Sequence, residues 1–286
     1  MYLLNKRSCL DINPSGTDHV VCDPPFSEHT HSSAVSQVGG VFAKNDFGFS
    51  SIAPELQEYI ASACACASGY SVIFSDDVSL GSWREALGRH SCRIVRTIPW
   101  VRWSSPSIVK GRPPCMVEFV LIVLAEGGEE TFSGPGNFGL FEAKCLRGAG
   151  KHKTGKPLDL MLQIVDHFTR EGSRVYDPTM GRGTTGLACL MLGRHFMGCE
   201  LNPEEFEAAE DRIRLWAVHG ELDPTDAARE GRFKELQRDI TADKARISGN
   251  TERVRARNKS RKGLLDPADK EPTDQLDDAE VNTLEV

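Results

Sequence analysis

Two short motifs of this chain combine residue types that can do chemistry. The first, Asp23-Pro24-Pro25-Phe26, places a carboxylate, a backbone carbonyl and an aromatic ring in one turn, and its two prolines fix the backbone angle φ. Such a turn offers acceptors for the hydrogens of an amine on a planar ring, and a face on which that ring can stack. The structural alternative is that the double proline only ends a strand, as double prolines often do.

The second motif is a glycine loop from Asp177 to Thr185 (DPTMGRGTT), between a predicted strand at 173–176 and a predicted helix. Gly181 and Gly183 allow the backbone to approach a ligand where a Cβ would collide. Glu200 follows the next strand, where its carboxylate can accept both hydroxyls of a ribose. The loop lacks the lysine of a phosphate-binding P-loop, which argues against a triphosphate. These features predict a nucleoside cofactor; the alternative is a tight strand–helix turn with an incidental surface glutamate.

Strands that alternate with helices must position both motifs, and this alternation predicts a parallel α/β sheet. Short apolar or β-branched runs predict strands at 19–22, 70–75, 93–103, 116–125, 173–176 and 195–199. Apolar periodicity and capping residues predict helices at 54–67, around 83–87, and at 157–170, 184–192 and 203–219. Asn202 is the expected cap of the last helix.

The glycine loop and its flanks resemble the S-adenosylmethionine motif of bacterial and phage DNA amino-methyltransferases. That motif is Asp-Pro-Phe-x-Gly-x-Gly-Thr-Thr followed by Gly-x-Glu-x-x-Pro, and here the glutamate is Glu200. The segment from His152 to Pro157 is similar to the family's His-x-Thr-x-Lys-Pro segment, which lies against the methionine end of the cofactor. The catalytic motif precedes the cofactor motif, as in the β group of the family. Thr179 and Arg182 depart from the family pattern, which has an aromatic or cysteine and a small residue there.

The resemblance implies a Rossmann-like class I methyltransferase fold, α/β with a mostly parallel sheet and a circularly permuted motif order. It implies S-adenosylmethionine as cofactor. We expect no metal, because His29 and His31 have no third ligand of suitable type nearby in the sequence. The catalytic residues that it implies are Asp23, Pro24, Pro25 and Phe26. The cofactor-binding residues that it implies are Lys156, Pro157, Asp177, Pro178, Gly181, Gly183, Thr184, Thr185, Glu200 and Asn202.

The type of base follows from the first residue of the catalytic motif. The family has Asp-Pro-Pro-Tyr, or Ser-Pro-Pro-Tyr in many cytosine-N4 enzymes, so Asp23 favours the N6 amine of adenine. Phe26 in place of tyrosine keeps the stacking face and loses only the hydroxyl. The alternatives left open are transfer to cytosine N4, transfer to an amine in RNA, and a non-catalytic DNA-binding protein with the same fold.

DNA with a flipped adenine is the partner that the resemblance implies. Residues 104–150 occupy the place of the family's target-recognition region. The basic residues near it that we expect to contact phosphates are Lys110, Arg112, Lys144, Arg147, Lys151 and Lys153. Because this region is short, we expect limited target specificity, or reliance on a second subunit or on the tail. A homodimer and a cognate restriction or specificity protein are the further partners that we consider.

Charge is unevenly distributed along the chain, although the total is −7. Residues 229–262 hold 12 basic and 5 acidic residues, whereas residues 263–286 hold 1 basic and 8 acidic residues. We therefore divide the chain into a methyltransferase domain at 1–220, a basic helical extension at 221–262 and an acidic, disordered tail at 263–286. The extension is either a helix that tracks DNA or a solvated charged helix.

The sequence indicates a cytoplasmic protein, and the resemblance implies a bacterial or phage-infected cell. No apolar run approaches the roughly 20 residues that cross a bilayer. The first residues lack the apolar stretch and cleavage site of a secretory signal. The nine cysteines show no CxxC pattern, which is typical of reduced thiols and not of a zinc site.

Overall fold

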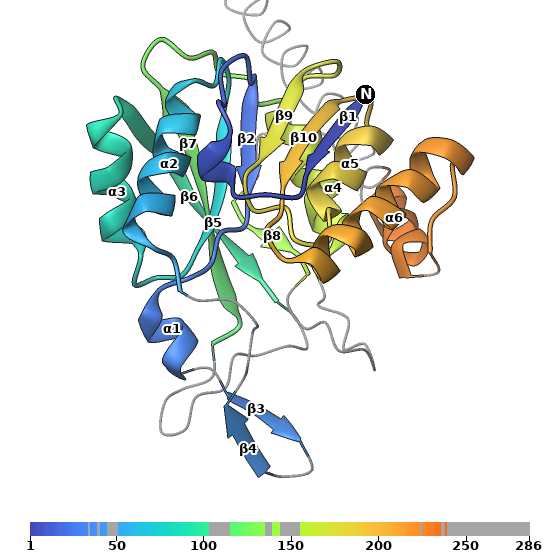
Figure 1. Ribbon diagram of the computed structural model, residues 1–286, viewed down its shortest axis with the longest axis horizontal. Coiled ribbons are helices and arrows are strands. Elements are labelled where there is room, and N and C mark those ends of the chain that lie inside the picture. Colours follow the sequence, from blue (N-terminus) through green and yellow to red (C-terminus); the bar gives the residue numbers. More distant parts are fainter. Residues whose placement is uncertain are drawn as a thin grey trace, which may run out of the picture. The chain divides into compact units, whose positions relative to one another are not determined.

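The main sheet of the computed structural model has eight strands in the order β1-β10-β9-β2-β5-β7-β6-β8 (Figure 1). Its strands are β1 (Tyr2–Asn5), β2 (His19–Cys22), β5 (Ser71–Ser75), β6 (Cys92–Val101), β7 (Val117–Ala125), β8 (Phe141–Glu142), β9 (Arg174–Asp177) and β10 (His195–Cys199). A separate antiparallel hairpin consists of β3 (Val35–Val38) and β4 (Val41–Lys44). The structure describes residues 1–33, 35–38, 41–44, 51–102, 115–134, 139–143, 155–223, 225–235 and 238.

Helices surround the sheet. They are the 3₁₀ helix η1 (Cys9–Asp11), α1 (Glu28–Ser33), α2 (Pro54–Ala65), α3 (Leu80–Arg89), α4 (Leu158–Phe168), α5 (Thr184–Met191) and α6 (Pro203–His219). Residues 225–235 are also helical. Two separate apolar clusters show that α2 and α3 cover one face of the sheet, while α4, α5 and α6 cover the other. The protein therefore has the three layers of a doubly wound α/β fold.

Most neighbouring strands of the sheet are parallel. The five strands from β1 to β5 in the sheet order pair in parallel, as predicted. The exception is β7, which is antiparallel to both β5 and β6. Alternation of strands and helices had predicted a parallel sheet. In the described part, however, no helix separates β6 from β7. Two strands that follow each other in this way can pair as an antiparallel hairpin.

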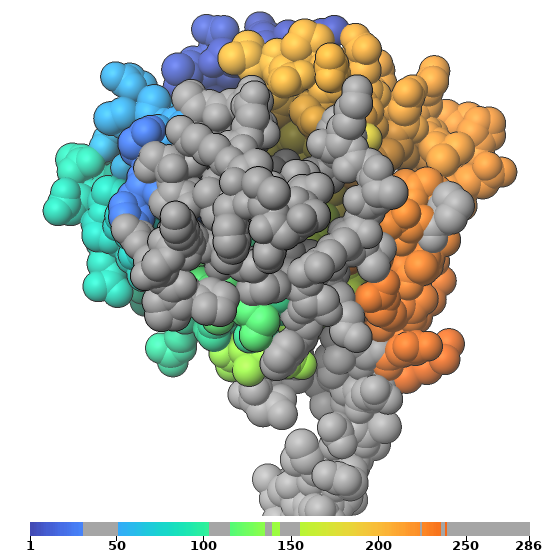
Figure 2. Space-filling view, turned by 90° about the horizontal axis from the view of Figure 1, so that it is seen from below, coloured from blue at the N-terminus to red at the C-terminus, as the bar shows by residue number. Residues whose placement is uncertain are grey.

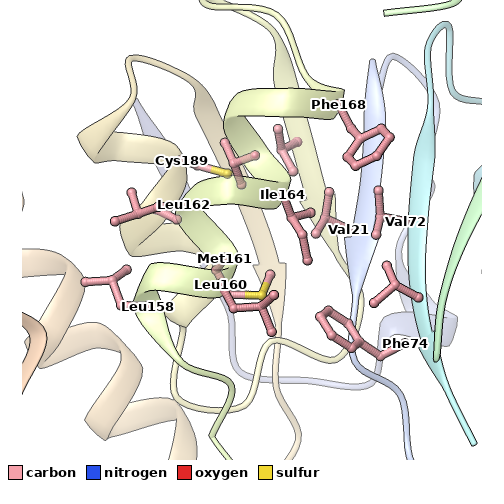
Figure 3. Packing of buried hydrophobic residues seen from close by; sticks show 14 of the residues in the cluster. Val21, Val72, Phe74, Leu158, Leu160, Met161, Leu162, Ile164, Phe168 and Cys189 are labelled. Carbon is pink, nitrogen blue, oxygen red and sulfur yellow. The ribbon is translucent and has the colours of Figure 1, made fainter. Parts of the chain in front are cut away.

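Alternating residues of the central strands supply the two cores. Val21 of β2, with Val72 and Phe74 of β5, faces α4, whose Ile164 and other apolar residues pack against them (Figure 3). The intervening residues of the same strands belong to the cluster on the other face. Helix α4 is buried along nearly its whole length.

The two ends of α6 lie where the sequence predicts them. Asn202 is the N-cap, and its side chain accepts hydrogen bonds from the backbone N–H groups of Glu204 and Glu205 at 2.9 and 3.3 Å. Pro203 occupies the first helical turn, and Gly220 ends the helix with a φ of 66°.

Two compact units divide the chain, Met1–Gln237 and Arg238–Val286. The first unit includes the helical segment 225–235, whose Phe233 belongs to the main core cluster. The second unit lies outside the described residues except for residue 238, so the acidic tail and most of the basic extension remain predictions. Within the described part, no helix has both the length and the apolar character that a membrane span requires.

Candidate active site

The two chemical motifs lie at the same edge of the sheet. Strands β2 and β9 are parallel neighbours, with His19 beside Val175 and Val20 beside Tyr176. Asp23 directly follows β2, and Asp177 is the last residue of β9. The strand order changes direction between these two strands, and in doubly wound sheets ligands bind in the crevice at such a point.

Lys156 joins the catalytic turn to the segment that precedes α4. Its Nζ lies 2.6 Å from Oδ2 of Asp23, and the side chains are 11% and 30% exposed, respectively. Burial raises the pKa of Asp23, the charge of Lys156 opposes this rise, and the charge of Glu118 adds to it. Burial alone would lower the pKa of Lys156, but the two carboxylates outweigh it and raise the pKa, so the amine stays an ammonium.

A second carboxylate, Glu118 of β7, completes the surroundings of Lys156. Its Oε2 lies 3.2 Å from the Lys156 nitrogen, and its Oε1 lies 3.0 Å from a guanidinium nitrogen of Arg102. The four side chains alternate in charge, from Arg102 through Glu118 and Lys156 to Asp23. Since each charge has an opposite neighbour, this half-buried network can persist away from water.

Aromatic rings enclose the ammonium of Lys156 on its other sides. Its nitrogen lies 4.8 Å from the ring centroid of Phe74, 5.4 Å from that of Phe26 and 5.6 Å from that of Trp100. Trp100 and Glu118 are directly opposed in the β6–β7 ladder, so they lie on one face of the sheet. Trp100 is buried, and one of its ring faces borders the site.

Asp76, at the end of β5, holds the chain directly after the catalytic turn. Its Oδ2 accepts hydrogen bonds from the backbone N–H of Ser27 at 3.1 Å and from the hydroxyls of Ser27 and Thr30 at 2.5 Å. Its Oδ1 accepts from the backbone N–H of Ser79 at 2.9 Å. Burial opposes the charge of Asp76, but the hydrogen bonds from Ser27, Ser79 and Thr30 lower its pKa overall. The buried carboxylate therefore anchors the turn to β5 and α3.

Asp177 closes the cofactor loop on itself. Its Oδ1 accepts from the backbone N–H of Thr179 at 3.0 Å, and its Oδ2 accepts from the hydroxyl of Thr185 at 2.6 Å. Burial raises its pKa to about 7; the bonds from Thr185 and Thr179 oppose the rise, and the charge of Asp23 adds to it. The predicted catalytic and cofactor carboxylates are thus close enough to influence each other.

The two loop glycines have different reasons to be glycine. Both have positive φ, 50° at Gly181 and 72° at Gly183. A Cβ at Gly183 would lie 2.9 Å from Ile213 and 3.0 Å from Ala209, both in α6, whereas a Cβ at Gly181 would meet nothing within 4 Å. The sequence argument had assigned both glycines to close approach by a ligand; at Gly183 the close neighbour is helix α6.

Glu200 links the loop to the start of α6. Its Oε2 accepts from the backbone N–H of Gly181 at 3.0 Å, and its Oε1 accepts from that of Asn202 at 2.7 Å. Burial raises its pKa, and these two hydrogen bonds oppose the rise. The ribose-binding role of Glu200 stays a prediction, and Asn202 serves the helix as its cap.

The other candidate residues differ in how much the structure says of them. Pro24 and Pro178 are buried, Pro25 is partly buried, and Pro157 is buried at the N-cap position of α4. Thr184, also buried, accepts a hydrogen bond from Arg212 at 3.1 Å. The six predicted DNA contacts lie outside the described residues: Lys110, Arg112, Lys144, Arg147, Lys151 and Lys153.

Reasoning from the sequence missed two residues that shape the site, Glu118 and Arg102, and it did not assign the anchoring role of Asp76. The structure shows Asp76 bonded both to the turn and to Ser79 at the start of α3. For Glu118 the sequence does hold a hint, because an acidic residue near the start of an apolar strand is unusual. The partners of Glu118, Lys156 and Arg102, could be identified only once the strand register was known.

Residues 129–211 match the family model described as DNA methylase. Over 82 residues the chain is 35% identical to the type II methyltransferase M2.LlaDCHI of Lactococcus lactis subsp. cremoris. This segment makes up 29% of this chain and 30% of that protein. Over 75 residues it is 39% identical to the type II methyltransferase M2.DpnII of Streptococcus pneumoniae, and this segment makes up 26% of this chain and 28% of that protein. The matched segment thus spans less than a third of either relative.

A solved structure extends the likeness to most of the chain. The M1.HpyAVI complex with S-adenosylmethionine superimposes with a TM-score of 0.55 and 25% identity, over 74% of this chain and 100% of that one. Together with the family match, this likeness confirms the predicted α/β methyltransferase fold and the predicted resemblance to DNA amino-methyltransferases.

Proposed function

We propose that this protein transfers the methyl group of S-adenosylmethionine to the N6 amine of adenine in DNA. The observation that carries the proposal is the position of Asp23 and Asp177 at the ends of the neighbouring parallel strands β2 and β9. One crevice can then hold the acceptor amine over the first motif and the cofactor over the second.

The loop after β9 fits a nucleoside cofactor. Among the described residues, Oγ1 of Thr179 and Nη1 of Arg182 are buried polar atoms of this loop without a hydrogen-bond partner, as expected of atoms that bind a ligand. These are the two positions at which the loop departs from the family pattern. Glu200, Asp177 and the backbone of Gly181 would hold the ribose and the polar groups of S-adenosylmethionine. When bound, the cofactor supplies a methyl group on a positive sulfonium, which is an activated electrophile.

The catalytic turn positions the amine. In this proposal Oδ1 of Asp23 and the carbonyl of Pro24 accept its two hydrogens, while Lys156 holds Oδ2 of the same carboxylate in place. The hydrogen bonds turn the nitrogen lone pair towards the methyl carbon, and Phe26 stacks on the extruded base. The bound cofactor would supply the methyl carbon that the nitrogen attacks, and the electron pair of the carbon–sulfur bond would stay on sulfur. The nitrogen then gives one proton to the carboxylate of Asp23.

DNA is the expected partner because both motifs belong to the same family pattern. Six basic residues from Lys110 to Lys153 and the basic extension at 221–262 are proposed to contact its phosphates, and the acidic tail at 263–286 to shield that extension. Sequencing of methylated sites across a genome that expresses the protein would test the expected limited specificity. A long, unique recognition sequence would contradict it.

Methyl transfer from labelled S-adenosylmethionine to unmethylated DNA, followed by mass spectrometry of the nucleosides, tests the proposal. We expect N6-methyladenine from the wild type and none from Asp23→Ala, while both bind the cofactor equally. N4-methylcytosine would keep the mechanism and overturn the choice of base. Cofactor binding without any methylated DNA nucleoside would contradict the proposed activity.

A further inference from the structure

The helical segment 225–235 follows α6 and is fixed at its start by Asp223. The carboxylate of Asp223 accepts hydrogen bonds from the backbone N–H groups of Thr225 at 2.8 Å and Asp226 at 3.0 Å. These bonds satisfy N–H groups that have no partner within the helix itself. In Figure 2 this segment, in orange, lies on the same side of the molecule as α6 and away from the blue-green α3.

A two-pronged ion pair joins this segment to α6. Nε and Nη2 of Arg212 donate to the two carboxylate oxygens of Asp226 at 3.0 and 2.9 Å. The Asp226 side chain is 6% exposed and that of Arg212 is 19% exposed. A planar guanidinium held by both oxygens has little freedom to turn, so Asp226 sets the direction of its remaining N–H groups.

Those remaining N–H groups point at the cofactor loop. Nη1 of Arg212 donates to the backbone carbonyl of Arg182 at 2.8 Å and to the hydroxyl of Thr184 at 3.1 Å. The loop residue between them, Gly183, is the glycine that packs against α6. Arg212 therefore holds the loop at the point where its backbone turns into helix α5.

A second buried ion pair fixes the other side of the segment. Nη1 of Arg229 lies 2.8 Å from Oδ1 of Asp159, and both side chains are less than one tenth exposed. Asp159 lies in the first turn of α4, three residues after Lys156. Arg229, the first basic residue of the proposed DNA-tracking extension, thus faces the protein interior and not a DNA surface.

We infer that Asp226 is a positioning residue for the cofactor loop and acts through Arg212. Segment 225–235 therefore contributes to cofactor binding, because it carries Asp226. This inference rests on the proposed function, because it names S-adenosylmethionine as the ligand of the loop. The matched family region ends at residue 211. The inference therefore gives a segment outside that region an influence on the affinity for the cofactor.

The test compares Asp226→Asn with Asp211→Asn in the full chain. Asp211 lies on the same helix as Arg212, but its ion pair with Arg214 is exposed to solvent and leaves the loop untouched. We expect the Kd of S-adenosylmethionine, measured by calorimetry, to rise about tenfold in Asp226→Asn, because a charged hydrogen-bonded pair is lost. The Kd of Asp211→Asn should stay within about twofold of the wild type.

Hydrogen exchange without the cofactor provides an independent readout. The amides of Gly183 and Thr184 should exchange faster in Asp226→Asn than in Asp211→Asn, and Asp226→Glu should restore part of the protection. If Asp226→Asn fails to fold, Arg212→Lys serves instead, since lysine keeps a charge for Asp226 but cannot bond all four acceptor atoms of Asp226, Arg182 and Thr184 at once. The same loss of affinity is expected there.

The outcomes separate this inference from the proposed function. A wild type that does not bind S-adenosylmethionine would contradict the proposed function. If the wild type binds S-adenosylmethionine and the folded Asp226→Asn protein shows the same Kd and the same loop exchange, only the positioning role is overturned. A lower Tm with unchanged Kd would likewise mean that the pair is merely structural.

Discussion

The ammonium of Lys156 lies 2.6 Å from the carboxylate of Asp23, although 133 residues separate them in the chain. A segment expected to lie against the cofactor therefore contacts the residue expected to handle the acceptor amine. Because Glu118 and three aromatic rings surround the same nitrogen, Lys156 is held in place from several elements. The arrangement ties the position of the catalytic carboxylate to the loop before α4.

Replacing Lys156 with glutamine should lower kcat about tenfold or more, since Asp23 would lose the cation that holds it. Without this cation the pKa of Asp23 rises further, and the carboxylate must be ionised to accept the amine. The acid limb of the kcat profile should therefore move to higher pH. Lys6→Gln, which removes an exposed pair with Glu207, is the control and should leave the profile unchanged. An acid limb that does not move would contradict this role of Lys156.

Replacing Asp76 with alanine should release the catalytic turn. The variant loses the acceptor of Ser27 and Thr30, so we expect kcat to fall about tenfold while the Kd of S-adenosylmethionine stays within about twofold. Steady-state kinetics and calorimetry measure the two quantities. The neighbouring Asp77 is exposed, and Asp77→Ala should match the wild type in both. Equal losses of kcat and of cofactor affinity in Asp76→Ala would instead indicate a general loss of structure.

Asp177 should make stability depend on pH. Its pKa is raised from the usual 3.8 to about 7 by burial, so between these values the unfolded chain releases a proton that the folded protein keeps. The contribution of this group therefore falls as pH rises from about 4 to about 7 and is constant above that. Asparagine can still bond Thr179 and Thr185 but does not titrate.

Thermal unfolding at pH 5 and pH 7.5 measures this effect. The Tm of Asp177→Asn relative to the wild type should be higher at pH 7.5 than at pH 5. Asp211→Asn, at an exposed carboxylate, is the control and should show no such change. A difference between Asp177→Asn and the wild type that is the same at both pH values would contradict the raised pKa.

Local chemistry in the sequence was enough to predict most elements. Helix α6 is an example, because Asn202, Pro203 and Gly220 each favour a helix end by their own backbone and side-chain preferences. Strand β1 at Tyr2–Asn5 was not predicted, since four residues of mixed character carry little periodicity. It forms because β10 offers a free edge to pair with.

The candidate site was predicted where it depends on residues adjacent in the chain. Two continuous motifs make up much of the site, Asp23 to Phe26 and Asp177 to Thr185. Their local backbone geometry depends on residues that are neighbours in the sequence, so it could be predicted. The contacts of Lys156 with Glu118 and of Arg212 with Asp226 depend on strand register and helix packing. A single sequence holds no direct record of either, which is why these partners became visible only in three dimensions.

The pairing of β1 with β10 has a consequence for folding during synthesis. β1 is bonded to β10, and Asn5 donates a side-chain hydrogen bond to the carbonyl of Gly198, 193 residues later. β2 likewise needs β9 as one of its two neighbours. The amino-terminal strands therefore leave the ribosome long before their partners exist, and a sheet with such distant contacts closes slowly. The crevice between the two motifs cannot form until about two thirds of the chain has been made, so a growing chain holds a catalytic turn with no cofactor loop beside it.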